Sequence, residues 1–330
     1  MRVLTSRSRW ATENPALMPL LALVLVLSLF RYLHTSVKLT MEAPFIDFAH
    51  YYTYTSVVAR GLDPFDPQSV AHVEDALRIR RAMAAANYPP LFYLLMLPWV
   101  LLSFRQAALA WFLASHVCLL AALGLCFRRF PSPNPVRVAT ALFVVLNYQP
   151  LIESFALGQA NAVLLFLVTL AWWGLRTSHM WVAAGSVAAA PFVKVQYALL
   201  LPLLYWMGHR RTLARALLLA GLGLAMGLAI LGPSHHLSYL GYVLSPPAGL
   251  YTAWTANLSP LATLHRLFGP SVAGRALATG VTLLLVVTLV LLFARAIPRL
   301  ARPDSPAADW SWGLGLAAVP ALIAYLRLSD

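Results

Sequence analysis

The chain has 330 residues, of which 60% are hydrophobic and only 11% are charged. An ordinary soluble domain carries roughly 25% charged residues, so this composition excludes a soluble globular protein and predicts an all-α membrane protein that crosses the bilayer several times. The formal charge of +13 does not indicate nucleic acid as a partner, because most arginines lie in short segments between apolar runs, as in cytoplasmic loops.

The first apolar run, residues 16–33, follows Arg2, Arg7 and Arg9 and is about as long as a bilayer core requires. It is longer than the apolar region of a typical signal peptide, and no small-residue cleavage site follows it before Arg31. We therefore expect this run to remain in the protein as the first membrane span, with the N-terminus in the cytoplasm.

A polar segment after this span reads PFIDFAHYYTYTSVVARGLDPFDP from residue 44. Asp47 opens a stretch with apolar and aromatic residues at helical spacing, so a helix cap on a surface-lying amphipathic helix explains it as well as a functional carboxylate does. Asp63 and Asp66 each precede a proline, which favours a role in turns. An interfacial position is enough to explain His50.

Nine further apolar runs follow, several of them shorter than the usual 20 residues of a membrane span. They are 89–104, 106–127, 137–152, 160–175, 181–193, 195–208, 213–232, 275–297 and 310–327. If every run crossed the membrane, the arginines near 128 and 210 would face the side opposite to the N-terminus, against the positive-inside tendency. We therefore predict that the segment 88–103, which holds three prolines, is re-entrant or lies on the surface.

With that segment left out, all the arginine clusters lie in the cytoplasm and four polar features lie on the outer side. They are two loops, 35–105 and 233–274, and two turns, one at 158–161 and one at Lys194. The first loop is expected to carry surface or re-entrant helices. We expect the whole chain, 1–330, to form a single membrane domain.

Lys194 stands in the apolar stretch PFVKVQYALLL, where an ammonium group near hydrocarbon costs a few kcal/mol unless it reaches the headgroups or meets an anion. Its expected outer position favours a phosphate partner. Gln159 and Asn161 are explained equally by helix capping or by binding of sugar hydroxyls. Asn257 lies in an Asn-Leu-Ser sequon, the pattern of a glycosylation acceptor, and Arg266 follows nine residues later.

One carboxylate beside a cation suits the transfer of a sugar from a lipid-linked sugar phosphate. The phosphate leaving group is already a stable anion and needs no general acid, so a single carboxylate suffices to take the proton from the acceptor hydroxyl. A glycoside hydrolase normally needs two carboxylates. Cationic side chains or amides then hold the phosphate as negative charge develops on it.

Five short motifs, in their order along the chain, resemble those of the polyprenyl-phosphate-mannose-dependent mannosyltransferases of glycosyltransferase family 87, within the GT-C superfamily. They are D-F-A-H-Y-Y with R-G-L-D-P-F-D, N-Y-P-P-L-F, G-Q-A-N, F-V-K-V-Q, and N-L-S-P with H-R-L-F-G. The resemblance implies a GT-C-like bundle of about 9–10 transmembrane helices in the cell membrane. It also implies inverting mannosyl transfer at the outer face, from a polyprenyl-phosphate sugar to a glycan or glycolipid acceptor.

The resemblance assigns the role of catalytic base to Asp47. We assign the donor phosphate to Lys194 and Arg266, and substrate binding to His50, Tyr51, Tyr88, Gln159, Asn161, Gln196 and Asn257. The sequence has no zinc-ligand spacing and no phosphate-binding glycine loop, so we expect no metal and no cofactor beyond the donor substrate. The segment 305–312, SPAADWSW, departs from the family pattern because the histidine that usually follows is missing.

Two other functions fit the same residues. A transporter or flippase for lipid-linked sugars uses the same basic and aromatic groove but needs no base. A catalytically inactive relative of the enzyme fits the different C-terminal end. A carboxylate placed over the groove distinguishes the enzyme from the transporter, because transport requires binding groups but no proton abstraction.

Overall fold

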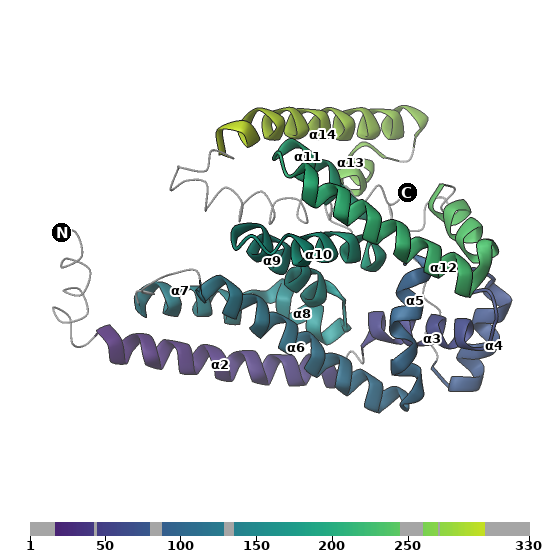
Figure 1. The fold of residues 1–330 in the computed structure, drawn as a ribbon. Coiled ribbons are helices and arrows are strands. Elements are labelled where there is room, and N and C mark those ends of the chain that lie inside the picture. Colours follow the sequence, from purple (N-terminus) through teal and green to yellow (C-terminus); the bar gives the residue numbers. More distant parts are fainter. Residues whose placement is uncertain are drawn as a thin grey trace. The chain divides into compact units, whose positions relative to one another are not determined.

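The structure is a computed structural model, and it describes residues 17–42, 45–79, 88–128, 135–244, 260–269 and 271–300. Within these ranges the regular secondary structure is helical and no strand is present, as predicted (Figure 1). The chain divides into two compact units. The first comprises Met1–Tyr52 and Trp99–Phe166, and the second comprises Thr53–Pro98 and Leu167–Asp330. The expected single domain over 1–330 stays a prediction.

Helices of the first unit come from both ends of its sequence. It contains α2 (Leu17–Glu42), the start of α3 (Ile46–Ala59), α6 (Phe104–Arg128), α7 (Pro135–Asn147), α8 (Gln149–Leu157) and the start of α9 (Asn161–Arg176). Polar side chains join α2 to α7, because Arg31 donates a 2.6 Å hydrogen bond to Asn147 Oδ1 and the Asn147 amide donates a 2.9 Å hydrogen bond to Ser28 Oγ. Such bonds between apolar helices stabilise their association in lipid.

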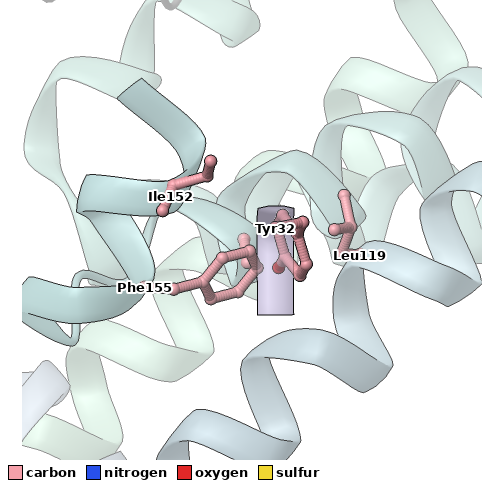
Figure 2. Close-up of a cluster of buried hydrophobic side chains, with 5 residues drawn as sticks. Tyr32, Leu119, Ile152 and Phe155 are labelled. Carbon is pink, nitrogen blue, oxygen red and sulfur yellow. The ribbon is translucent and has the colours of Figure 1, made fainter. Parts of the chain in front are cut away.

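The core of the first unit is a cluster of buried side chains from α2, α6, α8 and α9. Tyr32, Leu119, Ile152 and Phe155 pack together there with Ala162 (Figure 2). The Tyr32 hydroxyl donates a 2.8 Å hydrogen bond to His116 Nε2, and His116 Nδ1 donates to the Phe112 carbonyl oxygen at 2.8 Å. The Tyr32 hydroxyl and both nitrogens of the His116 ring are therefore hydrogen-bonded.

The second unit holds the rest of α3 and most of the later helices. They are α4 (Pro67–Leu77), α5 (Pro90–Met96) with the start of the 3₁₀ segment η1 (Leu97–Leu101), α10 (Met180–Val193), η2 (Val195–Leu199), α11 (Leu200–Trp206), α12 (Arg210–Leu244), α13 (Pro260–Phe268) and α14 (Val272–Leu300). Helix α10 packs closely on α12, since a β-carbon on Gly223 would lie 2.8 Å from the Phe192 ring. Gly223 and Gly227 of GLGLAMG, within the apolar part of α12, thus serve close packing rather than a phosphate cradle.

Three of the described helices are long and apolar enough to cross a bilayer, namely Met18–Lys38, Phe104–Arg128 and Arg210–Gly241. The pair Val138–Asn147 and Gln149–Leu157, bent by 53°, adds a fourth if it is one broken span. Large apolar side chains are exposed along these helices, for example Leu27 at 58%, as lipid contact requires. The chain is an all-α polytopic membrane protein, while the expected number of crossings, the orientation and the GT-C arrangement stay predictions.

Two predicted loops prove to be partly helical. The loop at 35–105 carries α3, α4, α5 and η1, and α2 extends into it as far as Glu42. The segment 88–103 forms the short apolar helix Pro90–Leu101, which falls below the length of a membrane span. The loop at 233–274 begins with helical residues, because Gly232 (φ 76°, ψ 168°) breaks α12 and Pro233 then opens a second helical segment, where its missing N–H costs nothing.

Candidate functional site

Asp47 lies in the first turn of α3, one residue after the helix begins at Ile46. It therefore stands just inside the helix rather than at its cap, and the Ala49 amide donates to the Phe45 carbonyl oxygen at 2.7 Å. Unsatisfied N–H groups and the positive end of the helix dipole favour a carboxylate in this turn. The side chain is half-buried.

The turn after α8 lies directly against the start of α3. Gly158 ends α8 in the left-handed region (φ 72°), and a β-carbon there would lie 2.6 Å from Cβ of Phe48 and 3.3 Å from its backbone nitrogen. Only glycine allows this approach. The structure thus brings the G-Q-A-N motif against the D-F-A-H-Y-Y motif.

Hydrogen bonds and stacked rings hold this contact. Trp111 Nε1 donates a 2.8 Å hydrogen bond to the carbonyl oxygen of Gly158, and the Ala160 amide donates to the Tyr51 hydroxyl at 3.4 Å. The Phe48 ring stacks on Trp111 with 5.7 Å between ring centroids. Tyr51 is fully buried and joins the start of α3 to the turn after α8, while its role in substrate binding stays a prediction. Trp111 was not predicted, since a tryptophan in an apolar helix carries no local signal of such a role.

His50 lies three residues after Asp47, on the same side of α3. Its ring keeps some exposed surface, but Nε2 is buried. Burial lowers the pKa of His50 from 6.5 to about 4, because the charged ring loses its hydration. At neutral pH His50 is therefore an uncharged neighbour of the start of α3.

Gln159 and Asn161 are bonded to each other. Asn161 Nδ2 donates to Gln159 Oε1 at 2.5 Å and to Ser154 Oγ at 3.2 Å. Helix α8 is closed instead by two backbone bonds, from the amide of Gly158 to Phe155 O and from the amide of Gln159 to Ser154 O. Both amide side chains are half-buried beside the start of α3, so they stand where they can contact a substrate.

Lys194 marks a break in the helical path of the second unit. Helix α10 contains Pro191 and ends at Lys194, whose backbone is extended (φ −143°, ψ 119°), and η2 follows with the half-buried Gln196. The Lys194 side chain is half-buried as well. A cation at a helix C-terminus is favourable by itself, so the position suits both a structural lysine and a phosphate ligand.

Tyr88 belongs to an aromatic cluster of the second unit. It stacks on Phe92 with 4.6 Å between ring centroids, and Tyr54 stacks on Tyr93 at 6.1 Å. Burial raises the pKa of Tyr93 well above its ordinary value, and the nearby Tyr54, Tyr88 and Tyr239 raise it further. Tyr54 of α3, Tyr93 of α5 and Tyr239 of α12 therefore lie close together with Tyr88, which precedes α5.

Asp63 and Asp66 both make local hydrogen bonds in the segment where the sequence favoured turns. Asp63 also contacts a distant helix. Asp66 caps α4 by accepting from the amides of Gln68 and Ser69, and the Ser69 hydroxyl, followed by these amides, lowers the pKa of its carboxyl. Asp63 Oδ1 accepts from the Phe65 amide at 2.9 Å. Its other oxygen, Oδ2, accepts from Ser238 Oγ at 3.2 Å, which ties the loop to α12.

Sequence reasoning missed the residues of α12 that follow its kink. His235 Nε2 donates to the Leu62 carbonyl oxygen at 3.3 Å, and His236 Nδ1 donates to the Gly232 carbonyl oxygen at 2.9 Å. The sequence did contain an indication of these residues. Two histidines follow Gly-Pro at the end of an apolar span, and polar side chains near lipid are costly, so they indicate a functional role.

Two predicted substrate residues remain, and one of them lies outside the described ranges. Arg266 is exposed in the last turn of α13 and bonds Thr263 Oγ1 at 3.3 Å. Asn257 and the segment 305–312 lie outside the described residues. Among the described residues, no three His, Cys, Asp or Glu side chains form a group that could hold a metal ion. Asp47, Gln159 and Asn161 belong to the first unit, whereas Lys194, Gln196 and Tyr88 belong to the second.

Long apolar helices with polar residues at their breaks and ends define an integral membrane protein. The sequence model of glycosyltransferase family 87 matches residues 87–324, well over half of the chain. The chain therefore belongs to glycosyltransferase family 87, whose members transfer a sugar from a donor to an acceptor, here in a membrane environment. The match includes the motifs around Tyr88, Gly158 and Lys194 and begins after Asp47. No curated protein and no solved structure matches the chain.

Proposed function

We propose that the protein transfers a mannosyl group from a polyprenyl-phosphate sugar to a hydroxyl of a glycan or glycolipid, with inversion at the anomeric carbon, at the outer face of the cell membrane. The observation that carries this proposal is the contact between the start of α3, which holds Asp47, and the Gly158 turn, which lies in the family match. This contact joins the turn that holds Asp47 to the turn that holds Gln159 and Asn161, and in the proposal these two amide side chains bind sugar hydroxyls.

In the proposed reaction the Asp47 carboxylate takes the proton of the acceptor hydroxyl while that oxygen attacks the anomeric carbon. The bond between this carbon and the phosphate oxygen breaks, and its electron pair leaves with polyprenyl phosphate. Since the phosphate leaves as an anion, no second carboxylate is required. The proton on Asp47 then returns to water.

Lys194 is proposed to hold the phosphate, assisted by Arg266. An ammonium group offers a point charge and three donors to the phosphate oxygens, and the break between α10 and η2 leaves Lys194 at the end of a helix. One carboxylate base and cationic side chains on the phosphate are the only groups that this scheme uses, so the proposal includes no metal.

The experiment supplies purified protein in micelles with polyprenyl phosphate that carries labelled mannose or labelled glucose, together with a lipid extract of the native membrane. The proposal predicts that only mannose is transferred to a lipid or glycan product. Anomeric NMR signals should show that the configuration of the mannose in the product is opposite to its configuration in the donor. Equal use of both sugars would remove the mannose assignment, and retention of configuration would remove the single-base mechanism.

A further inference from the structure

A second polar group of the molecule lies around the kink of α12, entirely within the second unit. We call Asp63, Tyr93, His235, Ser238 and Tyr239 the kink cluster. Three contacts join the loop after α3 to α12, namely Asp63 to Ser238 at 3.2 Å, Leu62 to His235 at 3.3 Å, and the Phe65 ring to the Tyr239 ring at 5.9 Å between centroids. The nearby Tyr239 also raises the pKa of Tyr93, which places α5 beside the same cluster.

Three polar atoms of the kink cluster are buried and have no hydrogen-bond partner among the described residues. They are the hydroxyls of Tyr93 and Tyr239 and Nδ1 of His235. The Tyr88 amide lies near the Tyr93 hydroxyl but outside hydrogen-bonding geometry. Folded proteins rarely leave such atoms unsatisfied, because each costs about 1–3 kcal/mol. Three of them in one cluster therefore provide hydrogen-bonding capacity for a polar molecule.

The hydrogen-bonding character of these atoms describes that molecule. His235 donates through Nε2, so Nδ1 of the neutral ring is an acceptor. The tyrosine hydroxyls donate and accept, and Asp63 only accepts. A ligand that both donates and accepts at several points matches this set, as the hydroxyls of a sugar do. A phosphate is disfavoured, because the cluster contains a carboxylate and none of its members is a lysine or arginine.

The setting of the kink cluster suits a sugar ring as well. Tyr93 is fully buried at 0% exposure, whereas Asp63, His235, Ser238 and Tyr239 are half-buried and keep some exposed surface. Aromatic rings of Phe65 and Tyr239 offer apolar faces to the C–H groups of a ring. The kink at Gly232 makes this possible, because it redirects the helix just before His235.

We propose that the kink cluster binds the pyranose ring of a sugar substrate through its hydroxyl groups. This inference rests on the proposed function for the presence of sugar substrates and adds a subsite to it. The ring belongs to the donor or to the acceptor, and the experiment below separates these two sources.

The test uses the full chain in detergent micelles and measures saturation-transfer NMR signals of methyl α-D-mannopyranoside and methyl α-D-glucopyranoside. Wild-type protein is expected to transfer saturation to at least one of them. Tyr93→Phe and Tyr239→Phe remove only a hydroxyl, and each is expected to weaken that binding about fivefold, as the loss of one hydrogen bond does. Tyr148→Phe, at an exposed tyrosine before α8, is the matched control and should bind as wild type does.

Thermal unfolding of the same variants excludes a folding defect. Loss of an unsatisfied buried hydroxyl should leave the Tm of Tyr93→Phe equal to or above that of wild type. No saturation transfer in wild type, or equal binding by wild type, Tyr93→Phe and Tyr239→Phe, would overturn the proposal and leave ordered water as the occupant of the cluster.

Kinetics then identify the source of the ring. Tyr93→Phe raises the KM of the polyprenyl-phosphate sugar if the ring is the donor's, and the KM of the acceptor if it is the acceptor's. An unchanged KM for both contradicts a sugar site. The NMR measurement needs no turnover. If the protein binds the glycosides but does not use the polyprenyl-phosphate sugar, the proposed donor is refuted and sugar binding at the kink cluster still stands.

Discussion

Trp111 donates a 2.8 Å hydrogen bond from its indole nitrogen to the carbonyl oxygen of Gly158, and this fixes the turn that supports the start of α3. Gly158 in turn lies so close to Phe48 that no side chain fits between them. Asp47 precedes Phe48 directly. The position of the proposed base therefore depends on a glycine that lies far away in the sequence.

Gly158→Ala should destabilise the protein strongly and impair sugar transfer. Alanine in the left-handed region costs about 1 kcal/mol, and its β-carbon would also overlap Phe48, which raises the expected loss to roughly 3 kcal/mol or more. Thermal unfolding in micelles and donor turnover measure the two effects.

Gly61→Ala is the matched control for this change. Gly61 ends α3 with nearly the same φ of 71°, but a β-carbon there would meet no atom within 4 Å. Gly61→Ala should therefore lower the free energy of unfolding by only about 1 kcal/mol, the cost of alanine in a left-handed backbone conformation. Equal losses of stability in the two variants would show that the contact with Phe48 is not tight.

Lys194→Ala should weaken donor binding by about ten- to a hundredfold, the value of a charge-assisted hydrogen bond of 1.5–3 kcal/mol. Lys38→Ala, at the other lysine of the chain, is the control and should leave the KM of the donor unchanged. The measurement is the KM of the polyprenyl-phosphate sugar at saturating acceptor. If Lys194→Ala binds the donor as tightly as wild type, the role of the lysine is limited to stabilising the C-terminus of α10.

Acid should destabilise the protein through His50. The folded pKa is about 4 and the ordinary value is 6.5, so between these pH values the unfolded chain binds more protons than the folded chain, and stability falls as pH falls. The contribution is fully present above pH 6.5 and amounts to about 3 kcal/mol. Unfolding at pH 7 and pH 4.5 measures it.

His50→Gln should reduce this dependence on pH, while His72→Gln, at an exposed residue of α4, should retain it. The variants need comparison only with wild type at the same two pH values. A wild-type slope that survives unchanged in His50→Gln would assign the acid sensitivity to other groups.

Membrane helices such as α6 and α12 could be predicted because their length and apolar composition follow from the bilayer and not from tertiary contacts. Their ends were harder to place. The run 137–152 is divided near Tyr148, where a new helix begins with Pro150 at its second position. The sequence predicts a loop from Pro233, but this proline opens a helical segment, since proline suits both a loop and the first turn of a helix.

Local structure outside the site could be predicted in part: the sequence favoured a turn at Asp66, and this residue begins α4 as its cap, with partners within three residues. The contact between Tyr51 and Ala160 joins residues 109 positions apart, and no local pattern reports it. The sequence did suggest that both motifs serve one site. The unsatisfied hydroxyl of Tyr93 is a property of packing alone, which explains why the kink cluster was missed.

The most direct test of Asp47 as the base is donor turnover by Asp47→Asn, whose side chain is nearly isosteric but not basic. Asp66→Asn is the matched control, because asparagine caps a helix about as well as aspartate does and Asp66 caps α4. We predict that purified Asp47→Asn binds polyprenyl-phosphate mannose as wild type does but transfers at least a hundredfold less sugar, consistent with loss of general-base catalysis, while Asp66→Asn transfers normally. Transfer by Asp47→Asn at a rate close to that of wild type would contradict the assignment.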